Sequence, residues 1–170
     1  ILVVLRSILN YTAKRFPDTF PKVDIVYPKE SKKEMRVLTR EEQTLFVSYL
    51  LEELDECRFG ILLALLTGIR IGELCALRWE NISLKDNTIK ISSTMQRLKD
   101  MDQCREAKTK IVIGSPKSDM SIRTIPISDY AAKLCRKMNP KSPAAFILTG
   151  TSDYMEPRTL QYRMERYTET

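Results

Sequence analysis

The stretch Thr67-Gly68-Ile69-Arg70-Ile71-Gly72-Glu73-Leu74, followed by Cys75-Ala76-Leu77-Arg78-Trp79, decides the fold of this chain. The residues before it, 57–66, are mostly apolar and predict a core helix that stops at Gly68. Arg70 follows this glycine turn, so we expect it at the rim of a packed scaffold. A guanidinium held there suits phosphate, because its planar fork matches two phosphate oxygens at once.

Arg70 has two interpretations. As a surface residue it would pair with Glu73 on one helix face, a contact worth only about a few tenths of a kcal/mol. As a ligand-binding residue it would be oriented by Glu73 acting as a supporting carboxylate. The flanking Gly68 and Gly72 favour the second interpretation, since a glycine lets the backbone come close to a ligand.

The composition favours a polyanionic partner. The 170 residues carry a net charge of +6, enough chain for one domain and a piece of a second. Basic segments at 1–40 and 85–123 flank an acidic one at 41–84, an arrangement that suits DNA, although a solubilising surface would also explain it.

No run of about 18 apolar residues predicts a membrane span. Four scattered cysteines without a histidine provide no zinc site and indicate a reducing cytoplasm.

The pattern along the chain predicts an α+β domain that is mainly helical, with a small three-stranded antiparallel sheet. Apolar residues at helical spacing predict one helix over residues 1–16, and three prolines between 17 and 37 predict a linker. Alternating segments predict strands at 88–92, 110–113 and 122–127, with a loop over 99–108. A capping box of Thr39 and Glu42, a cap at Ser128 and helical periodicity predict further helices at about 40–54, 57–67, 71–77, 129–138 and 158–167.

Two further basic residues are candidates for contact with phosphate. Lys117 follows a proline in the turn between the last two expected strands, and Arg123 lies on the last of them. Lys117 is either a solvated turn residue or a flexible ammonium that donates a proton to a leaving oxygen. Arg123 either forms a cross-strand charge pair or contacts phosphate.

Residues 60–78 also have roughly the spacing of a helix-turn-helix, with Gly68 in the turn. A non-catalytic DNA-binding regulator would use the second helix to read bases. That helix would be formed by residues 71–77, which offer few side chains suited to base edges.

Together these segments resemble the catalytic domain of the tyrosine recombinases, the phage integrase family. Residues 67–79 resemble the box that holds the family's first catalytic arginine. Residues 116–127 resemble its lysine hairpin and the strand that follows, and residues 37–42 resemble the usual opening of the domain. The resemblance implies an integrase-like catalytic domain over 38–170, a linker over 17–37 and the tail of a core-binding domain over 1–16.

The resemblance also implies roles for these residues. Arg70 would clamp the scissile phosphate with Glu73 in support, and Lys117 would protonate the leaving 5′ oxygen. Thr67 and Arg123 would contact DNA. In the family a tyrosine attacks the phosphate and stores the bond energy as a 3′-phosphotyrosine link, so we expect no cofactor. The expected partners are double-stranded DNA and other recombinase protomers.

The chain departs from the family pattern in one respect. It contains no histidine, so the family's His-any-any-Arg box is not in it. None of its tyrosines looks like an activated nucleophile, and without one there is no covalent step. We therefore expect a DNA-binding fragment of a cytoplasmic recombinase of bacterial or phage origin, inactive by itself.

Overall fold

The chain forms two compact units, residues 1–37 and 38–170. The computed structural model describes residues 1–20, 23, 25–28, 36–100, 109–115, 121–138 and 142–168. In the first unit, α1 (Leu2–Arg15) confirms the helix predicted over residues 1–16, and the described residues of 17–37 form neither helix nor strand. The assignment of α1 to a core-binding domain stays a prediction.

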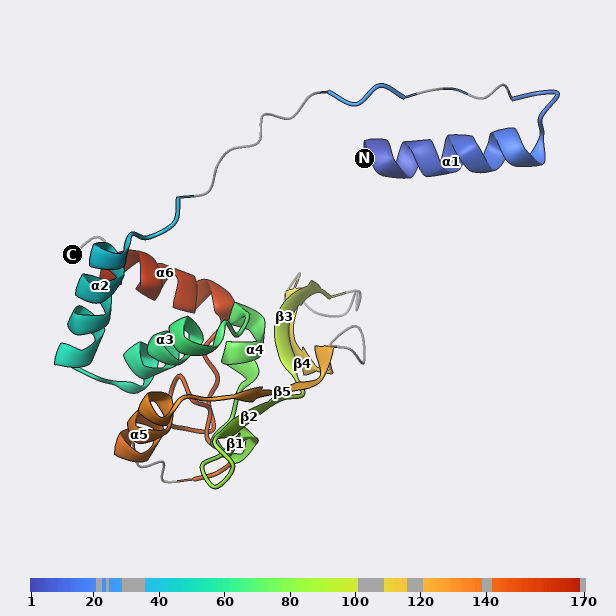
Figure 1. The fold of residues 1–170 in the computed structure, drawn as a ribbon. Helices are drawn as coiled ribbons and strands as arrows, with labels where there is room; N and C mark the ends of the chain where they lie inside the picture. Colours follow the sequence, from blue (N-terminus) through green and yellow to red (C-terminus); the bar gives the residue numbers. More distant parts are fainter. Residues whose placement is uncertain are drawn as a thin grey trace. The chain divides into compact units, whose positions relative to one another are not determined.

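The second unit is built mainly from helices that begin at recognisable capping residues (Figure 1). Thr39 and Glu42 form the predicted capping box, in which each side chain accepts a hydrogen bond from the other residue's backbone N–H. Asp55 caps the next helix by accepting from the backbone N–H of Arg58 at 2.7 Å. The helices of this unit are α2 (Arg40–Glu52), α3 (Glu56–Thr67), α4 (Ile71–Ala76), α5 (Asp129–Met138) and α6 (Pro157–Thr168), with the short 3₁₀ turn η1 (Trp79–Asn81).

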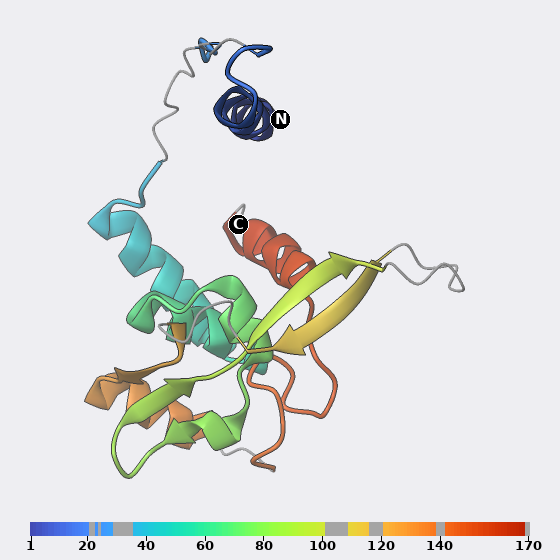
Figure 2. The same ribbon diagram turned by 90° about the vertical axis from the view of Figure 1, so that its right-hand side faces the viewer.

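The strands of the described residues form two antiparallel sheets rather than one. The three-stranded sheet has the order β1 (Ile82–Ser83), β2 (Thr88–Ile91), β5 (Arg123–Pro126). The predicted strand at 110–113 lies instead in β4 (Thr109–Gly114), which pairs with β3 (Thr94–Lys99) as a separate hairpin. Figures 1 and 2 both show this hairpin beside α4.

Two sequence-based expectations therefore need correction. Residues 94–99 form a strand that was not predicted, because Met95 is its one buried residue and the burial signal of period two is weak. The segment that contains Lys117 connects strands of two different sheets, so among the described residues β4 and β5 do not form a hairpin with each other. Lys117 itself lies outside the described residues.

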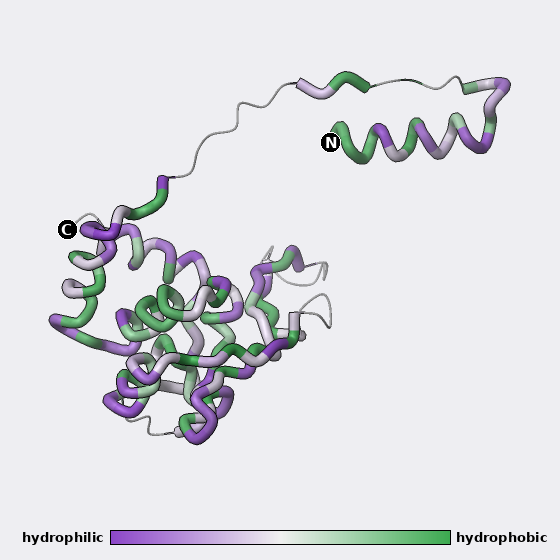
Figure 3. The backbone as a smooth tube through the Cα atoms, viewed as in Figure 1, coloured by the Kyte–Doolittle hydropathy of each residue, from purple (hydrophilic) through white to green (hydrophobic). Residues whose placement is uncertain are grey.

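The core is centred on α3, which Figure 3 shows as a mostly hydrophobic segment, in contrast to the largely hydrophilic α6. Phe59 and Leu62 of α3 are fully buried, as are Ile89 and Ile91 of β2. Trp79 packs in the core, with its ring stacked on Phe59 at 5.5 Å between centroids. The core thus joins α3 to the three-stranded sheet and fixes the turn between α3 and α4.

Two glycines shape the turn before α4 and the approach of α4 to β3. Gly68 ends α3 in the left-handed conformation, with φ 68°, which a side chain would disfavour. Gly72 lies against β3, because a Cβ there would meet the Thr94 hydroxyl at 2.8 Å and the Met95 carbonyl at 2.9 Å. The close approach expected at Gly72 is therefore made to the hairpin of the same chain rather than to a ligand.

Candidate functional site

The candidate site is formed where α3 ends and α4 begins. Arg70 is the residue that precedes the first turn of α4, and its backbone is extended, with φ −69° and ψ 147°. Its side chain is 73% exposed. The guanidinium therefore projects into solvent from a backbone position fixed by the core on one side and by the glycine turn on the other.

Glu73 is the buried centre of the site, with a side chain only 4% exposed. Its carboxylate accepts a hydrogen bond from the Arg70 backbone N–H at 3.0 Å and one from Nη1 of Arg70 at 3.2 Å. It also accepts two from Arg123, from Nη1 and from Nη2, each at 2.8 Å. One carboxylate thus binds two arginines that lie on different elements.

These hydrogen bonds hold Glu73 in its charged form. Those from Arg123 are the largest cause of a Glu73 pKa lowered to about 2, with smaller contributions from Arg70, while burial acts in the opposite direction. The same bonds raise the pKa of Arg123. The carboxylate is therefore ionised at every pH at which the protein would work, and it offers the two guanidinium groups a full negative charge.

Arg123 lies at the start of β5, opposite the buried Ile91 of β2. Its side chain is 31% exposed, far less than that of Arg70. Besides its two bonds to Glu73, its Nη1 donates to the Ser121 carbonyl at 3.3 Å. The charge pair that was one alternative for Arg123 is present, but it joins β5 to α4 rather than to the neighbouring strand.

The structure brings together three of the five predicted site residues. Thr67 lies one turn away, at the end of α3, where its hydroxyl donates to the Leu63 carbonyl at 2.6 Å. Among the described residues, this hydroxyl forms no hydrogen bond to Arg70 or Glu73. Lys117 is outside the described residues, so its place relative to Arg70 stays a prediction.

The helix-turn-helix alternative fits the structure poorly. The second helix of such a unit must be exposed to enter a DNA groove. Here α4 has six residues, and Leu74, Cys75 and Ala76 are buried in the core together with Glu73. A helix this short and this buried is a support for Arg70, and its exposed residue Ile71 is apolar and offers no hydrogen bond to a base edge.

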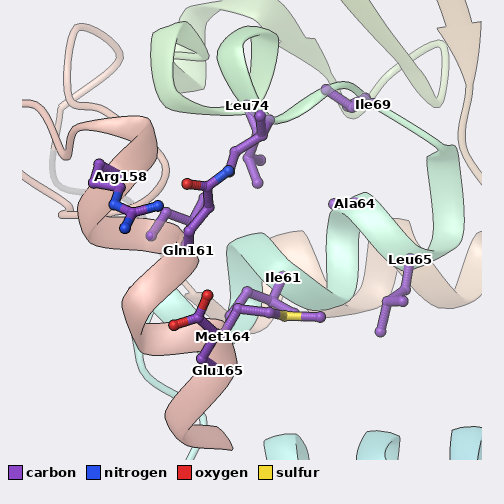
Figure 4. Close-up of a pocket in the computed structure, with 11 residues that line it drawn as sticks. Ile61, Ala64, Leu65, Ile69, Leu74, Arg158, Gln161, Met164 and Glu165 are labelled. Carbon is purple, nitrogen blue, oxygen red and sulfur yellow. The ribbon is translucent and has the colours of Figure 1, made fainter. Parts of the chain in front are cut away.

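A separate apolar groove of about 470 Å³ lies between α6 and the α3–α4 turn. Figure 4 shows Ile61, Ala64 and Leu65 of α3 on one side and Gln161 and Met164 of α6 on the other. Arg70, Glu73 and Arg123 are not among the residues that line it. Its apolar lining does not suit phosphate, so the groove is distinct from the charged site.

The described part of the chain holds no cluster of three or more residues able to bind a metal ion. Within the same residues no helix is long and apolar enough to cross a membrane. Cys57, Cys75 and Cys135 are buried as unpaired thiols, and burial raises the pKa of Cys75 to about 12. These thiols are packing groups of the core.

Sequence reasoning missed one feature of the site, namely the binding of Glu73 to Arg123. The two residues are 50 positions apart, and local spacing contains no signal for a contact at that separation. The only available signal was the set of alternating strands at 88–92 and 122–127. Their pairing places Arg123 at the edge of the sheet next to α4.

The second unit is similar to known proteins over nearly its whole length. The model of the phage integrase family matches residues 36–169. A "Tyrosine recombinase XerC-like" protein of Caldanaerobacter subterraneus subsp. tengcongensis is 35% identical over 66 residues, which make up 39% of this chain and 17% of that protein.

Solved structures of integrases and recombinases have the same fold. The Tn1549 transposon integrase in complex with a circular intermediate DNA matches with a TM-score of 0.65 and 18% identity, over 93% of this chain and 53% of that one. The XerA recombinase matches with a TM-score of 0.55 and 14% identity, over 96% and 52%. These likenesses confirm the predicted integrase-like fold, and the chain spans about half the length of the structures it matches.

Proposed function

Because the chain belongs to the phage integrase family, we propose that it forms the phosphate-binding part of a site at which a recombinase cuts and rejoins double-stranded DNA. The observation that carries this proposal is the exposed guanidinium of Arg70, fixed at its backbone by the buried Glu73 carboxylate. The Tn1549 integrase, which has the same fold, was solved in complex with DNA. The likeness supports duplex DNA as the partner of this chain.

In the proposed mechanism Arg70 binds two non-bridging oxygens of the scissile phosphate. The phosphate gains negative charge as it approaches its transition state, so a preorganised cation accelerates the reaction more than it strengthens binding. Glu73 orients the Arg70 side chain, but it does not fully neutralise the guanidinium, whose charge stays available to the phosphate. The nucleophile of the family is a tyrosine, and we assign that role to none of the tyrosines in these 170 residues.

Lys117 has a proposed role as the general acid that protonates the leaving 5′ oxygen. In a full-length recombinase that carries this segment, Lys117→Ala should slow cleavage. A substrate with a 5′-bridging sulfur should restore much of the rate, because a thiolate leaves without a proton. A variant that stays slow on this substrate, as Arg70→Ala should, would argue against an acid role for Lys117.

The binding part of the proposal is tested by titrating labelled duplex DNA with this chain at low and moderate salt. We expect weak binding with little sequence preference, which falls steeply with salt because phosphate contacts release counterions. Absence of binding at low salt, or binding that salt does not change, would contradict the proposal. Tight binding to a single sequence would favour a regulator instead. Assembly with other recombinase protomers on the DNA is part of the same proposal.

A further inference from the structure

Arg70 and Arg123 share one carboxylate, but they share it unequally. Arg123 donates both terminal nitrogens to Glu73 at 2.8 Å, the geometry of a bidentate arginine–carboxylate pair. Arg70 donates one terminal nitrogen at 3.2 Å and is otherwise held through its backbone N–H. The strong contact therefore belongs to the arginine that is less exposed, and the weak one to the arginine that faces solvent.

This inequality has a consequence for the charge of the site. A buried carboxylate with a single arginine nearby would draw that arginine into a full pair, since an unpaired buried charge is costly. If Arg123 were absent, the only guanidinium left to Glu73 in this contact would be that of Arg70. With Arg123 in place, the carboxylate is already satisfied, and the guanidinium of Arg70 keeps most of its donors directed at solvent.

Arg123 is also well placed to act as an anchor. It begins β5, which pairs with β2 from Arg123 to Pro126, opposite the core residue Ile91. Glu73 belongs to α4, which is held against β3 at Gly72. The pair therefore ties α4, which directly follows Arg70, to the three-stranded sheet across 50 positions of sequence.

We propose that Arg123 is a positioning residue rather than a phosphate contact, and that it holds Glu73 so that the Arg70 guanidinium stays available to DNA phosphate. This inference rests on the proposed function for the part played by DNA. It assigns different tasks to two arginines that sequence reasoning had placed together on the DNA. It also explains why Arg123 uses its terminal nitrogens on the chain itself.

The inference is tested by nitrogen NMR of the arginine side chains in this chain. In the free protein, the bidentate contact should slow rotation of the Arg123 guanidinium and give separate terminal-nitrogen signals, whereas those of Arg70 should be averaged. On addition of a short DNA duplex, the Nε–H signal of Arg70 should shift and that of Arg123 should stay in place. Averaged Arg123 signals in the free protein, or an Arg123 shift as large as that of Arg70, would overturn the inference.

The variant Arg123→Lys supplies a second readout. Lysine keeps the charge but cannot form the two parallel bonds. If Arg123 positions Glu73, this variant should bind duplex DNA roughly threefold to tenfold more weakly, the equivalent of about one ordinary hydrogen bond. The Nε–H signal of Arg70 should also move in the free protein. The matched control is Arg136→Lys in α5, an exposed arginine that donates to the Leu84 carbonyl, away from Glu73, and it should change neither.

The outcomes separate this inference from the proposed function. If the duplex shifts neither arginine, the DNA-binding proposal fails, and the separate or averaged signals of Arg123 in the free protein still decide whether it clamps Glu73. If Arg123→Lys binds DNA as tightly as the parent chain and leaves the Arg70 signal unmoved, charge alone matters at position 123. The positioning role would then be wrong.

Discussion

Two arginines of the second unit, Arg58 in α3 and Arg70 before α4, have opposite surroundings. The side chain of Arg58 is 11% exposed, and its guanidinium bonds to the Glu53 carbonyl and carboxylate. It also lies over the rings of Tyr49 and Tyr167, at 4.9 and 5.4 Å from their centroids. The side chain of Arg70 is 73% exposed and shares one carboxylate with Arg123.

The difference shows how a fold separates a structural arginine from one that can bind a ligand. Arg58 lies within a helix whose face is packed against α2 and α6, so its charge is used to join three helices. Arg70 lies outside the helix that follows it, and its backbone, rather than its guanidinium, makes the firm contact with Glu73. Fixing the backbone and leaving the charge free is what a phosphate ligand requires.

The largest expected effect is on catalysis. In a full-length recombinase that carries this segment, Arg70→Ala should lower the rate of DNA cleavage by about 10²–10³ while site binding is largely kept, because the contact strengthens in the transition state. The measurement is accumulation of the covalent protein–DNA adduct on a suicide duplex. Arg58→Ala, assayed where it is folded, should form adduct near the parental rate. Equal loss in both variants would remove the distinction between the two arginines.

The next effect is on stability through Glu73. Its pKa of about 2 lies below the ordinary value of 4.5, so its contribution is fully present above pH 4.5 and is lost as the pH falls towards 2. Glu73→Gln should therefore lower the free energy of unfolding by on the order of 3 kcal/mol at neutral pH. Urea unfolding at several pH values measures this.

The control for this prediction is Glu80→Gln, an exposed glutamate in η1. We expect it to change stability by less than about 0.5 kcal/mol. The Glu73→Gln variant should also have a flatter stability profile between pH 4.5 and 2. An unchanged profile would mean that the hydrogen bonds of Glu73 add little to folding.

Arg58, the arginine that joins three helices, should contribute less to the free energy of unfolding than Glu73. Arg58→Ala removes a partly desolvated contact with two tyrosine rings, for which a loss of about 2 kcal/mol is expected. Thermal or urea unfolding against the exposed control Arg40→Ala would measure it. A loss below about 0.5 kcal/mol would show that Arg58 is no more than a surface charge, and the contrast with Arg70 would disappear.

The smallest effect is expected at the turn before Arg70. Gly68 has φ 68° and open space around its Cβ position, so Gly68→Ala should cost about 1 kcal/mol through backbone strain alone. Gly114 also has open space but no positive φ, so Gly114→Ala is a matched control that should cost nothing comparable. Equal costs in unfolding experiments would show that the left-handed turn is not a source of strain.

The sequence predicted those parts of the fold that depend on local signals. The caps at Thr39 and Ser128 and the stop at Gly68 fixed three helix ends, because each is determined by residues within four positions. Strand β3 was not predicted, because its partner β4 is a later segment and most of its residues are exposed. The alternation of buried and exposed residues that indicates a strand is therefore weak in it. Gly72 was expected to let the backbone approach a ligand, whereas the structure shows a close approach to β3.

The candidate site was predictable to the same extent. Arg70 and Glu73 are three residues apart, so their contact follows from helix geometry. The bond between Glu73 and Arg123 depends on how α4 packs beside the sheet, which no local pattern encodes. The division of labour between the two site arginines is therefore a result of tertiary structure.

The most direct test of the central claim is the salt dependence of duplex DNA binding by this chain and two variants. If Arg70 contacts a DNA phosphate, Arg70→Ala should reduce the slope of log affinity against log salt by about 1, because one fewer counterion is released. Arg58→Ala, measured where it is folded, should leave the slope unchanged, since its guanidinium is used within the protein. An unchanged slope for Arg70→Ala would contradict the account.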